Sequence, residues 1–316
     1  MVMLSTKSIN GRKYLYAEYS FRLPDGSLKK LSKRITSDKD AKAPGTRAYF
    51  LQKETETSQV WALKKYSRDR IFTEKRIAEF ERYRVGFKRI KNELSKHQFD
   101  DLLKRFTCNF TYESNALEGN SLTLKDVTLL LYENVLPKNK ELREIFETRN
   151  THAAHELLFR GKVRLNIAYV LKIHKLVVKD MKIPVGWKTV PNFLVMRSVK
   201  TTPPERVQSD IEELFAWYES VRDTWHALKI AAHFHARFER IHPFEDGNGR
   251  VGRILLNAIL MDSGYPPLII RRTMRQSYFS ALDAADKRHF DKMENFLIEK
   301  FRDTYNKFFE IYIKYV

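Results

Sequence analysis

The chain of 316 residues contains a single cysteine, Cys108, which excludes an internal disulfide and agrees with a reducing compartment. No stretch approaches the about 20 apolar residues of a membrane-spanning helix, and the N-terminus lacks the apolar run of a signal peptide. Internal repeats and low-complexity tracts are also missing from the sequence. These absences predict a cytoplasmic protein without a membrane span.

Acidic residues are scarce beside basic ones: 39 aspartates and glutamates face 58 lysines and arginines, a net charge of +19. One interpretation is that a basic N-terminal module binds nucleic acid, with an affinity that falls as salt rises. The other is a solvated, lysine-rich surface of the kind found in thermophilic proteomes. The sequence leaves both open.

The length of the chain suggests about two domains, and its beginning differs from the rest. Residues 13–21 alternate in a way typical of a strand, 24–26 mark a turn, and 28–35 can return as a second strand. We therefore expect a small basic β-rich module over residues 1–65. A linking helical region, rich in arginine and lysine, is expected over residues 66–109.

Residues 242–253 concentrate chemical groups in one short run, His-Pro-Phe-Glu-Asp-Gly-Asn-Gly-Arg-Val-Gly-Arg. Helical patterns flank this run, so a loop would present backbone N–H groups at the start of the second helix, where anions bind well. Arg250 and Arg253 share one face of that helix and can clamp successive phosphates. With His242 beside them, the run predicts a phosphate site with its own general base.

The same run contains a literal G-x-G-x-x-G at residues 247–252, which could suggest a dinucleotide-binding turn. That motif needs a preceding strand and an acidic residue about 20 positions later. Here the preceding segment is helical, and Asp262 comes too early. No Gly-Lys-Ser/Thr follows the loop, so a P-loop is excluded as well.

Residues 242–250 match the pattern H-P-F-x-[D/E]-G-N-[G/K]-R, and Arg253 extends it. The chain thus resembles the Fic-domain family, over roughly residues 110–297. The resemblance implies a mainly α protein: a helical Fic-type catalytic domain over 110–316 with a short β-hairpin flap, preceded by the β-rich module and a linking helix.

The resemblance also implies a role for each residue of the motif. His242 would be the general base that takes a proton from a hydroxyl of a target protein, and Asp246 would bind Mg²⁺. Arg250 would hold the inner phosphates of the nucleotide and Arg253 the terminal one. The anion hole would be lined by Gly247, Asn248 and Gly249.

Gly249 stands where other members of the family carry lysine and act as kinases. The glycine implies transfer of AMP from ATP to a serine, threonine or tyrosine hydroxyl of a target protein, with release of pyrophosphate. Two alternatives stay open: transfer of another nucleotide-derived group, or a nucleic-acid-associated regulator with a silent Fic site. Relatives commonly form homodimers, which is a further expectation.

A second family pattern, [S/T]-x-x-x-E-[G/N], matches residues 114–119. By resemblance, Glu118 would pair with Arg253, displace the γ-phosphate of ATP and so inhibit the enzyme, while Ser114 would brace the helix. An ordinary capped helix with a solvated glutamate is the alternative. Glu118 could also position water for removal of AMP from the target, which the sequence does not decide.

The target-docking flap would lie within residues 181–206, with a β-prone stretch at 193–199. This interval is longer than the usual flap of the family, so the sequence does not indicate which target protein would dock there. A zinc site at His233, His235 and His242 is not favoured, because positions two apart on a helix face different ways and no cysteine pair joins them.

Overall fold

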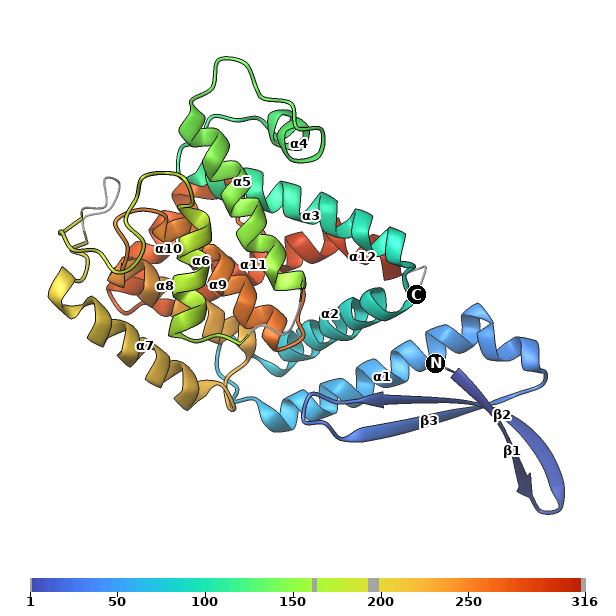
Figure 1. Cartoon of the computed structure of the whole chain (residues 1–316). Coiled ribbons are helices and arrows are strands. Elements are labelled where there is room, and N and C mark those ends of the chain that lie inside the picture. The colour runs from blue at the N-terminus through green and yellow to red at the C-terminus, as the bar shows by residue number, and fades with distance from the viewer. Residues whose placement is uncertain (1, 161–163, 193–198, 314–316) are drawn as a thin grey trace. The chain divides into compact units, whose positions relative to one another are not determined.

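The computed structural model describes residues 2–160, 164–192 and 199–313 (Figure 1). The predicted class is confirmed: the chain is mainly helical, with a small antiparallel sheet at its N-terminus. It divides into two compact units, 1–94 with 312–316, and 95–311. This division differs from the expected boundaries at residues 65 and 109. Among the described residues, no helix is both long and apolar enough to cross a membrane.

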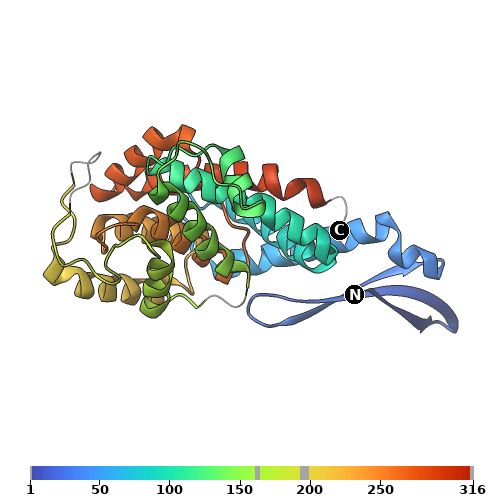
Figure 2. The same ribbon diagram turned by 45° about the horizontal axis from the view of Figure 1, so that its top comes forward.

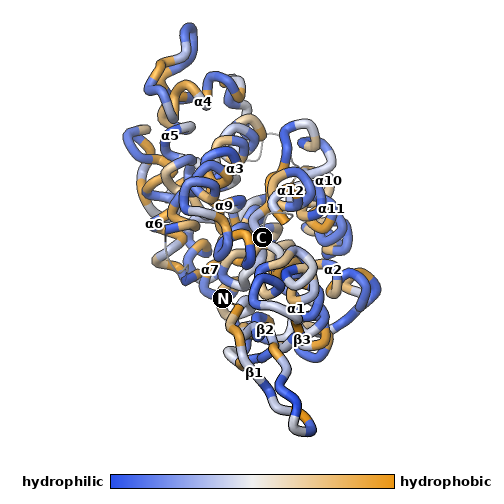
Figure 3. Tube along the Cα trace, turned by 90° about the vertical axis from the view of Figure 1, so that its right-hand side faces the viewer, coloured by the Kyte–Doolittle hydropathy of each residue, from blue (hydrophilic) through white to orange (hydrophobic). Residues whose placement is uncertain are grey.

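The sheet of the first unit has three strands in the order β1 (Val2–Ile9), β2 (Arg12–Arg22) and β3 (Leu28–Ile35). The expected hairpin is present as β2 and β3, while β1 was missed. Asn10 and Gly11, both with positive φ, join β1 to β2, and Asn-Gly is the residue pair that favours such two-residue turns. Hydrophilic and hydrophobic residues are both present along the strands, without strict alternation (Figure 3).

One face of this sheet packs on η1 (Asp38–Lys42) and α1 (Pro44–Lys65), around a core of Ala17, Ile35, Ala41 and Phe50. Helix α2 (Glu74–Glu93) packs on α1 and belongs to the same unit. The buried carboxylate of Glu54 joins β2, α1 and α2. Glu54 of α1 accepts hydrogen bonds from the hydroxyl of Tyr19 at 2.8 Å, from Lys88 at 2.8 Å and from Arg89 at 3.2 Å. These contacts explain why the unit extends past residue 65.

The regular elements described in the second unit are helices, joined by loops. Its helices are α3 (Lys96–Leu117), α4 (Leu124–Tyr132), α5 (Leu142–Glu156), η2 (Leu157–Phe159), α6 (Ile167–Val177), η3 (Pro204–Arg206), α7 (Val207–Val221), α8 (Ala227–Ile241), α9 (Asn248–Asp262), η4 (Arg272–Met274), α10 (Arg275–Asp286) and α11 (Phe290–Phe308). The short α12 (Glu310–Ile313) follows.

The pair α8 and α9 forms the centre of the second unit (Figure 1 and Figure 2). Helices α7, α10 and α11 pack on α8, while α3, α5 and α6 pack on α9. The apolar positions expected to face the core are buried: Leu228, Ala231, Ala232, Phe234 and Phe238. Helix α9 is buried along nearly its whole length, so its first turn is held rigidly.

The flap region is only partly described. Residues 193–198, most of the expected β-prone stretch, lie outside the described residues. The described neighbours, 181–192 and 199–206, form a loop that ends in η3.

Candidate nucleotide-binding site

The loop between α8 and α9 begins at His242, which ends α8 in the left-handed conformation, with φ of 50°. Its N–H still donates to the carbonyl oxygen of Phe238 at 2.9 Å. Histidine is among the residues that tolerate this uncommon conformation, and backbone strain of this kind gathers at functional sites. The turn leaves the side chain of His242 partly exposed at the mouth of the loop.

The loop is closed by Asn248, whose side chain is buried. Its Oδ1 accepts the backbone N–H of Phe244 at 2.8 Å, and its Nδ2 donates to the carbonyl of Phe244 at 2.7 Å. Both polar ends of the amide are therefore used within the loop. Asn248 therefore fixes the shape of the loop that would form the anion hole. Its side-chain polar atoms are directed at the backbone of Phe244.

His174 of α6 supports the loop from below. Its ring stacks on that of Phe244 with centroids 3.7 Å apart, and its Nε2 lies 3.2 Å from the carbonyl oxygen of Asp246. The N–H of Gly186 approaches Nδ1 at 3.5 Å. Burial lowers the pKa of His174 to about 4, so its ring is neutral at pH 7. This arrangement favours the tautomer in which Nε2–H donates to Asp246.

Lys188 binds the other end of the loop. Its backbone N–H donates to the carbonyl of Pro243 at 2.8 Å, and its Nζ donates to Asn192 Oδ1 at 2.7 Å. Burial lowers the pKa of Lys188 to about 8. No sequence signal marked this lysine.

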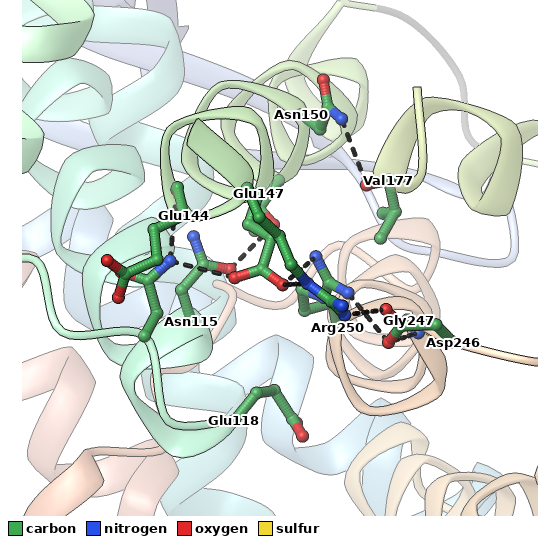
Figure 4. A network of polar contacts seen from close by, with 12 residues as sticks. Asn115, Glu118, Glu144, Glu147, Asn150, Val177, Asp246, Gly247 and Arg250 are labelled. Atoms are coloured by element: carbon green, nitrogen blue, oxygen red, sulfur yellow. Dashed lines mark hydrogen bonds and ion pairs between the residues drawn. The ribbon is translucent and has the colours of Figure 1, made fainter. Parts of the chain in front are cut away.

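Asp246 lies in a network of charges that Figure 4 shows from close by. Its Oδ2 contacts Arg143 of α5 at 2.5 Å, and its Oδ1 contacts Arg250 at 3.1 Å. Glu147 completes the ring, with Oε1 at 3.2 Å from Arg143 and 3.6 Å from Arg250. Arg143 and Glu147 were not anticipated, because an i,i+4 pair of arginine and glutamate is typical of any solvated helix surface.

Arg250 is 2% exposed and stands in the first turn of α9. Within the described part of the chain, its Nε and Nη1 have no hydrogen-bond partner. Donors left over in a buried guanidinium are costly unless an acceptor fills the space beside them. The N–H groups of the first helical turn add further donors. The arrangement can therefore hold an oxyanion such as a phosphate.

Arg253, one turn further along α9, is buried and engaged by the end of α3. Its Nη2 lies 2.7 Å from Oε1 of Glu118, its Nε donates to Ser114 Oγ at 2.9 Å, and Nη2 also donates to the carbonyl of Ser114 at 2.8 Å. The contact between Glu118 and Arg253 expected from the resemblance is present. Ser114 contributes by binding the arginine directly.

Gly249 faces the same carboxylate. A Cβ at this position would overlap Oε1 of Glu118 and lie 2.9 Å from Nη1 of Arg253. With Glu118 in this position, residue 249 has no room for a side chain. The structure thus gathers all the residues expected from the two motifs around the start of α9.

The other histidines of α8 do not converge on one point. His233 Nε2 contacts Glu294 at 2.7 Å, whereas His235 Nε2 contacts the hydroxyl of Tyr278 at 2.8 Å. Each is a buried core histidine with its own partner.

The chain is similar in sequence to known proteins over the region that contains this site. Residues 164–260 match the sequence model of the Fic/DOC family. The chain is 31% identical over 181 residues to the protein adenylyltransferase Fic of Nematostella vectensis, covering 55% of this chain and 42% of that protein. It is 27% identical over 207 residues to the protein adenylyltransferase fic-1 of Caenorhabditis elegans, covering 62% and 41%. The chain thus spans less than half the length of these curated relatives.

Solved structures give the same fold. A Fic domain containing signaling protein from Bacteroides thetaiotaomicron superposes with a TM-score of 0.65 at 24% identity, covering 73% of this chain and 97% of that one. A Fic family protein from Desulfovibrio desulfuricans superposes with a TM-score of 0.58 at 26% identity, covering 71% of each. The chain is thus similar to Fic/DOC proteins in the sequence of residues 164–260 and in fold.

Proposed function

We propose that this chain is a protein adenylyltransferase that is held inactive by its own Glu118. The curated relatives named above are protein adenylyltransferases, which supports the reaction class. The observation that carries the proposal is the buried Arg250, whose Nε and Nη1 have no hydrogen-bond partner within the described residues. Arg250 stands in the first turn of α9, directly after the loop that begins at the partly exposed His242, and Glu147 lies 3.6 Å from its Nη1.

In the proposed reaction, His242 takes the proton from a hydroxyl of the target protein. The hydroxyl oxygen bonds to the α-phosphorus of ATP, the bond from that phosphorus to the bridging oxygen breaks, and pyrophosphate leaves. Arg250 and the N–H groups at the start of α9 stabilise the charge on the phosphates. The rigid packing of α9 holds these groups in position. Positioning is most of what a protein contributes to the catalysis of phosphoryl transfer.

Inhibition follows from the same geometry. The carboxylate of Glu118 lies at 2.7 Å from Nη2 of Arg253, where the γ-phosphate would otherwise bind. A phosphate there would meet a like charge and would lose the arginine as its partner. ATP can then bind productively only after Glu118 moves away. The side chain of Glu118 is 41% exposed, so it can leave without unpacking the core.

Mg²⁺ suits the residues present. It prefers oxygen ligands, keeps several waters and often uses one carboxylate together with substrate phosphates. Asp246 offers such a carboxylate beside Arg250, but Arg143 holds one of its oxygens. We infer that the ion would bind at Asp246 after Arg143 has moved. When bound, it would neutralise charge on the phosphates.

The test is self-labelling with α-labelled ATP and Mg²⁺. We expect weak labelling of the wild type, strong labelling of Glu118→Gly, and none when His242→Ala is added. Glu133→Gly, which alters an exposed glutamate after α4, is the matched control and should behave as wild type. If Glu118→Gly binds ATP and stays unlabelled, AMP transfer is refuted and another transferred group must be sought.

Removal of AMP through Glu118 is a second activity that the same site supports, because the carboxylate faces the phosphate region beside Gly249. A chase of labelled protein tests it. Label should be lost faster from protein that retains Glu118 than from Glu118→Gly, and equal rates would exclude this role.

A further inference from the structure

The sheet of the first unit has one covered and one open face. Alternate residues of β2, such as Leu15, Ala17 and Tyr19, pack with the core under α1. The residues between them, and their partners across the strands, form the other side, which we call the open face. Its members are Met3, Ser5, Lys7, Ile9, Arg12, Tyr14, Tyr16, Glu18, Ser20, Arg22, Leu28, Lys30, Ser32 and Arg34.

The open face is strongly basic. Five of its side chains are exposed cations, namely Lys7, Arg12, Arg22, Lys30 and Arg34. Glu18 is its only acid, and Lys7 at 3.1 Å and Lys30 at 2.5 Å both contact it. The three arginines therefore face solvent without an acid on the same face. This pattern attracts a polyanion.

The charge of the whole chain is concentrated in this unit. Residues 1–94 contain 23 lysines and arginines against 11 aspartates and glutamates, so they carry +12 of the net +19. The remaining 222 residues carry 35 against 28, or +7. A merely lysine-rich surface would spread the excess evenly along the chain, and this chain does not.

The tyrosines of the open face help to identify the form of the polyanion. The Tyr14 ring is covered by the guanidinium of Arg34 at 3.9 Å from its centroid, and the Tyr16 ring by Lys7 at 4.7 Å. Proteins that bind single strands stack bases on free aromatic rings. Here the cations already occupy those rings, which favours a ligand read through its phosphates and groove edges.

The dimensions of the sheet fit a duplex. Two strand spacings of about 4.8 Å make the three backbones about 10 Å wide, against a B-DNA major groove about 12 Å wide. Arg12 and Arg22 stand at the two ends of β2, roughly 33 Å apart at the usual rise per residue. This distance is close to one turn of DNA. The major groove of A-form RNA is too narrow to admit such a sheet.

An anionic membrane is less well matched. Membrane-binding surfaces gather apolar side chains at one site to enter the lipid. The exposed apolar residues of this face are separated, because Leu28 pairs with Arg22 at one end of β2, Ile9 with Arg12 at the other, and Met3 with Glu18 between them.

We propose that the open face of this sheet docks in the major groove of double-stranded DNA, with its arginines on the phosphates. The proposal concerns a different part of the chain from the nucleotide site and stands independently of it.

The test measures binding of the full chain to a fluorescein-labelled 20-base-pair DNA duplex by anisotropy, over a series of salt concentrations. We expect micromolar or tighter binding at low salt. Arg12→Gln, Arg22→Gln and Arg34→Gln combined should lower the slope of log K against log salt by about three. At about 0.1 M salt this corresponds to a loss of roughly 2.7 orders of magnitude in affinity.

A charge-matched control combines Arg47→Gln, Lys64→Gln and Lys75→Gln, exposed residues of α1 and α2. It removes the same net charge and should retain nearly all of the affinity. Thermal unfolding of both triple variants checks that they fold. The proposal is overturned if the wild type does not bind the duplex at low salt, or if the two folded triple variants lose affinity equally.

Two further ligands separate the alternatives. Tighter binding of a single strand than of the duplex would identify a stacking surface and overturn the proposal. Binding to vesicles of phosphatidylserine and phosphatidylcholine without binding to the duplex would overturn it in favour of a membrane surface.

Discussion

Replacing Arg143 by glutamine should strengthen Mg²⁺ binding in this protein. Arg143 contacts Oδ2 of Asp246 at 2.5 Å, one of the two oxygens that could bind the ion. Arg250 contacts the other oxygen and is unchanged in the variant. The substitution therefore frees one oxygen of the proposed metal ligand and removes a positive charge beside it.

The size of the expected gain in Mg²⁺ affinity follows from how exposed this ion pair is. The Arg143 side chain is 59% exposed and that of Asp246 is 31% exposed, so breaking the contact costs about 0.2–1 kcal/mol. Repulsion between a guanidinium and a divalent ion about 5 Å away is roughly 1.7 kcal/mol in water and about 1 kcal/mol once about 0.1 M salt screens it. Together, about 1–2 kcal/mol corresponds to a Mg²⁺ half-saturation roughly 5- to 30-fold lower.

The measurement is a Mg²⁺ titration of the binding of a fluorescent ATP analogue, made in the Glu118→Gly background so that nucleotide can enter. Arg160→Gln is the matched control, because Arg160 forms an exposed i,i+4 pair with Glu156 just beyond α5. It should leave the titration unchanged. If Arg143→Gln requires more Mg²⁺, or binds nucleotide less well at saturating Mg²⁺, then Arg143 serves the phosphates and our reasoning is wrong.

Three further predictions concern the loop and its inhibitor. Gly249→Ala should raise self-labelling above wild type, because the new methyl group displaces Glu118; unchanged labelling would show that the carboxylate stays. Asn248→Ala should lower the free energy of unfolding in urea by about 2–3 kcal/mol, because it leaves buried groups of Phe244 unpaired; a loss below about 1 kcal/mol would contradict this. His174 has a pKa of about 4 when folded against about 6.5 when unfolded. The unfolded state therefore takes up a proton first, and stability should fall as pH drops from about 6.5 towards 4, by about 2 kcal/mol at pH 5. His174→Gln should remove that part of the pH dependence in urea unfolding measured at pH 7 and 5; an unchanged dependence would assign it to other groups.

The site motif could be predicted because its chemistry is local. His242, Asp246 and Arg250 lie within nine residues between two helices of clear periodicity, so sequence spacing already fixes their approximate geometry. The contact of Glu118 with Arg253 came only from family resemblance. Nothing in the periodicity of α3 indicates which helix its last turn will meet.

The missed features depend on contacts between distant segments. Arg143 looks like any surface arginine until α5 packs beside α9. Glu54 looks like a solvated helical glutamate until Arg89 of α2 and Tyr19 of β2 enclose it. The first strand, in contrast, could have been predicted from the sequence, because Asn10 and Gly11 form a pair typical of hairpin turns.

The lack of space at residue 249 also constrains how this chain can change over generations. Any side chain there collides with Glu118, which is distant in the sequence but adjacent in the fold. Under the proposed autoinhibition, a mutation at 249 would therefore displace Glu118 at the same moment as it alters the candidate phosphate site. A lineage that acquires lysine at this position would first have to lose Glu118, or go without the proposed inhibition. Glycine 249 and glutamate 118 should consequently be inherited together.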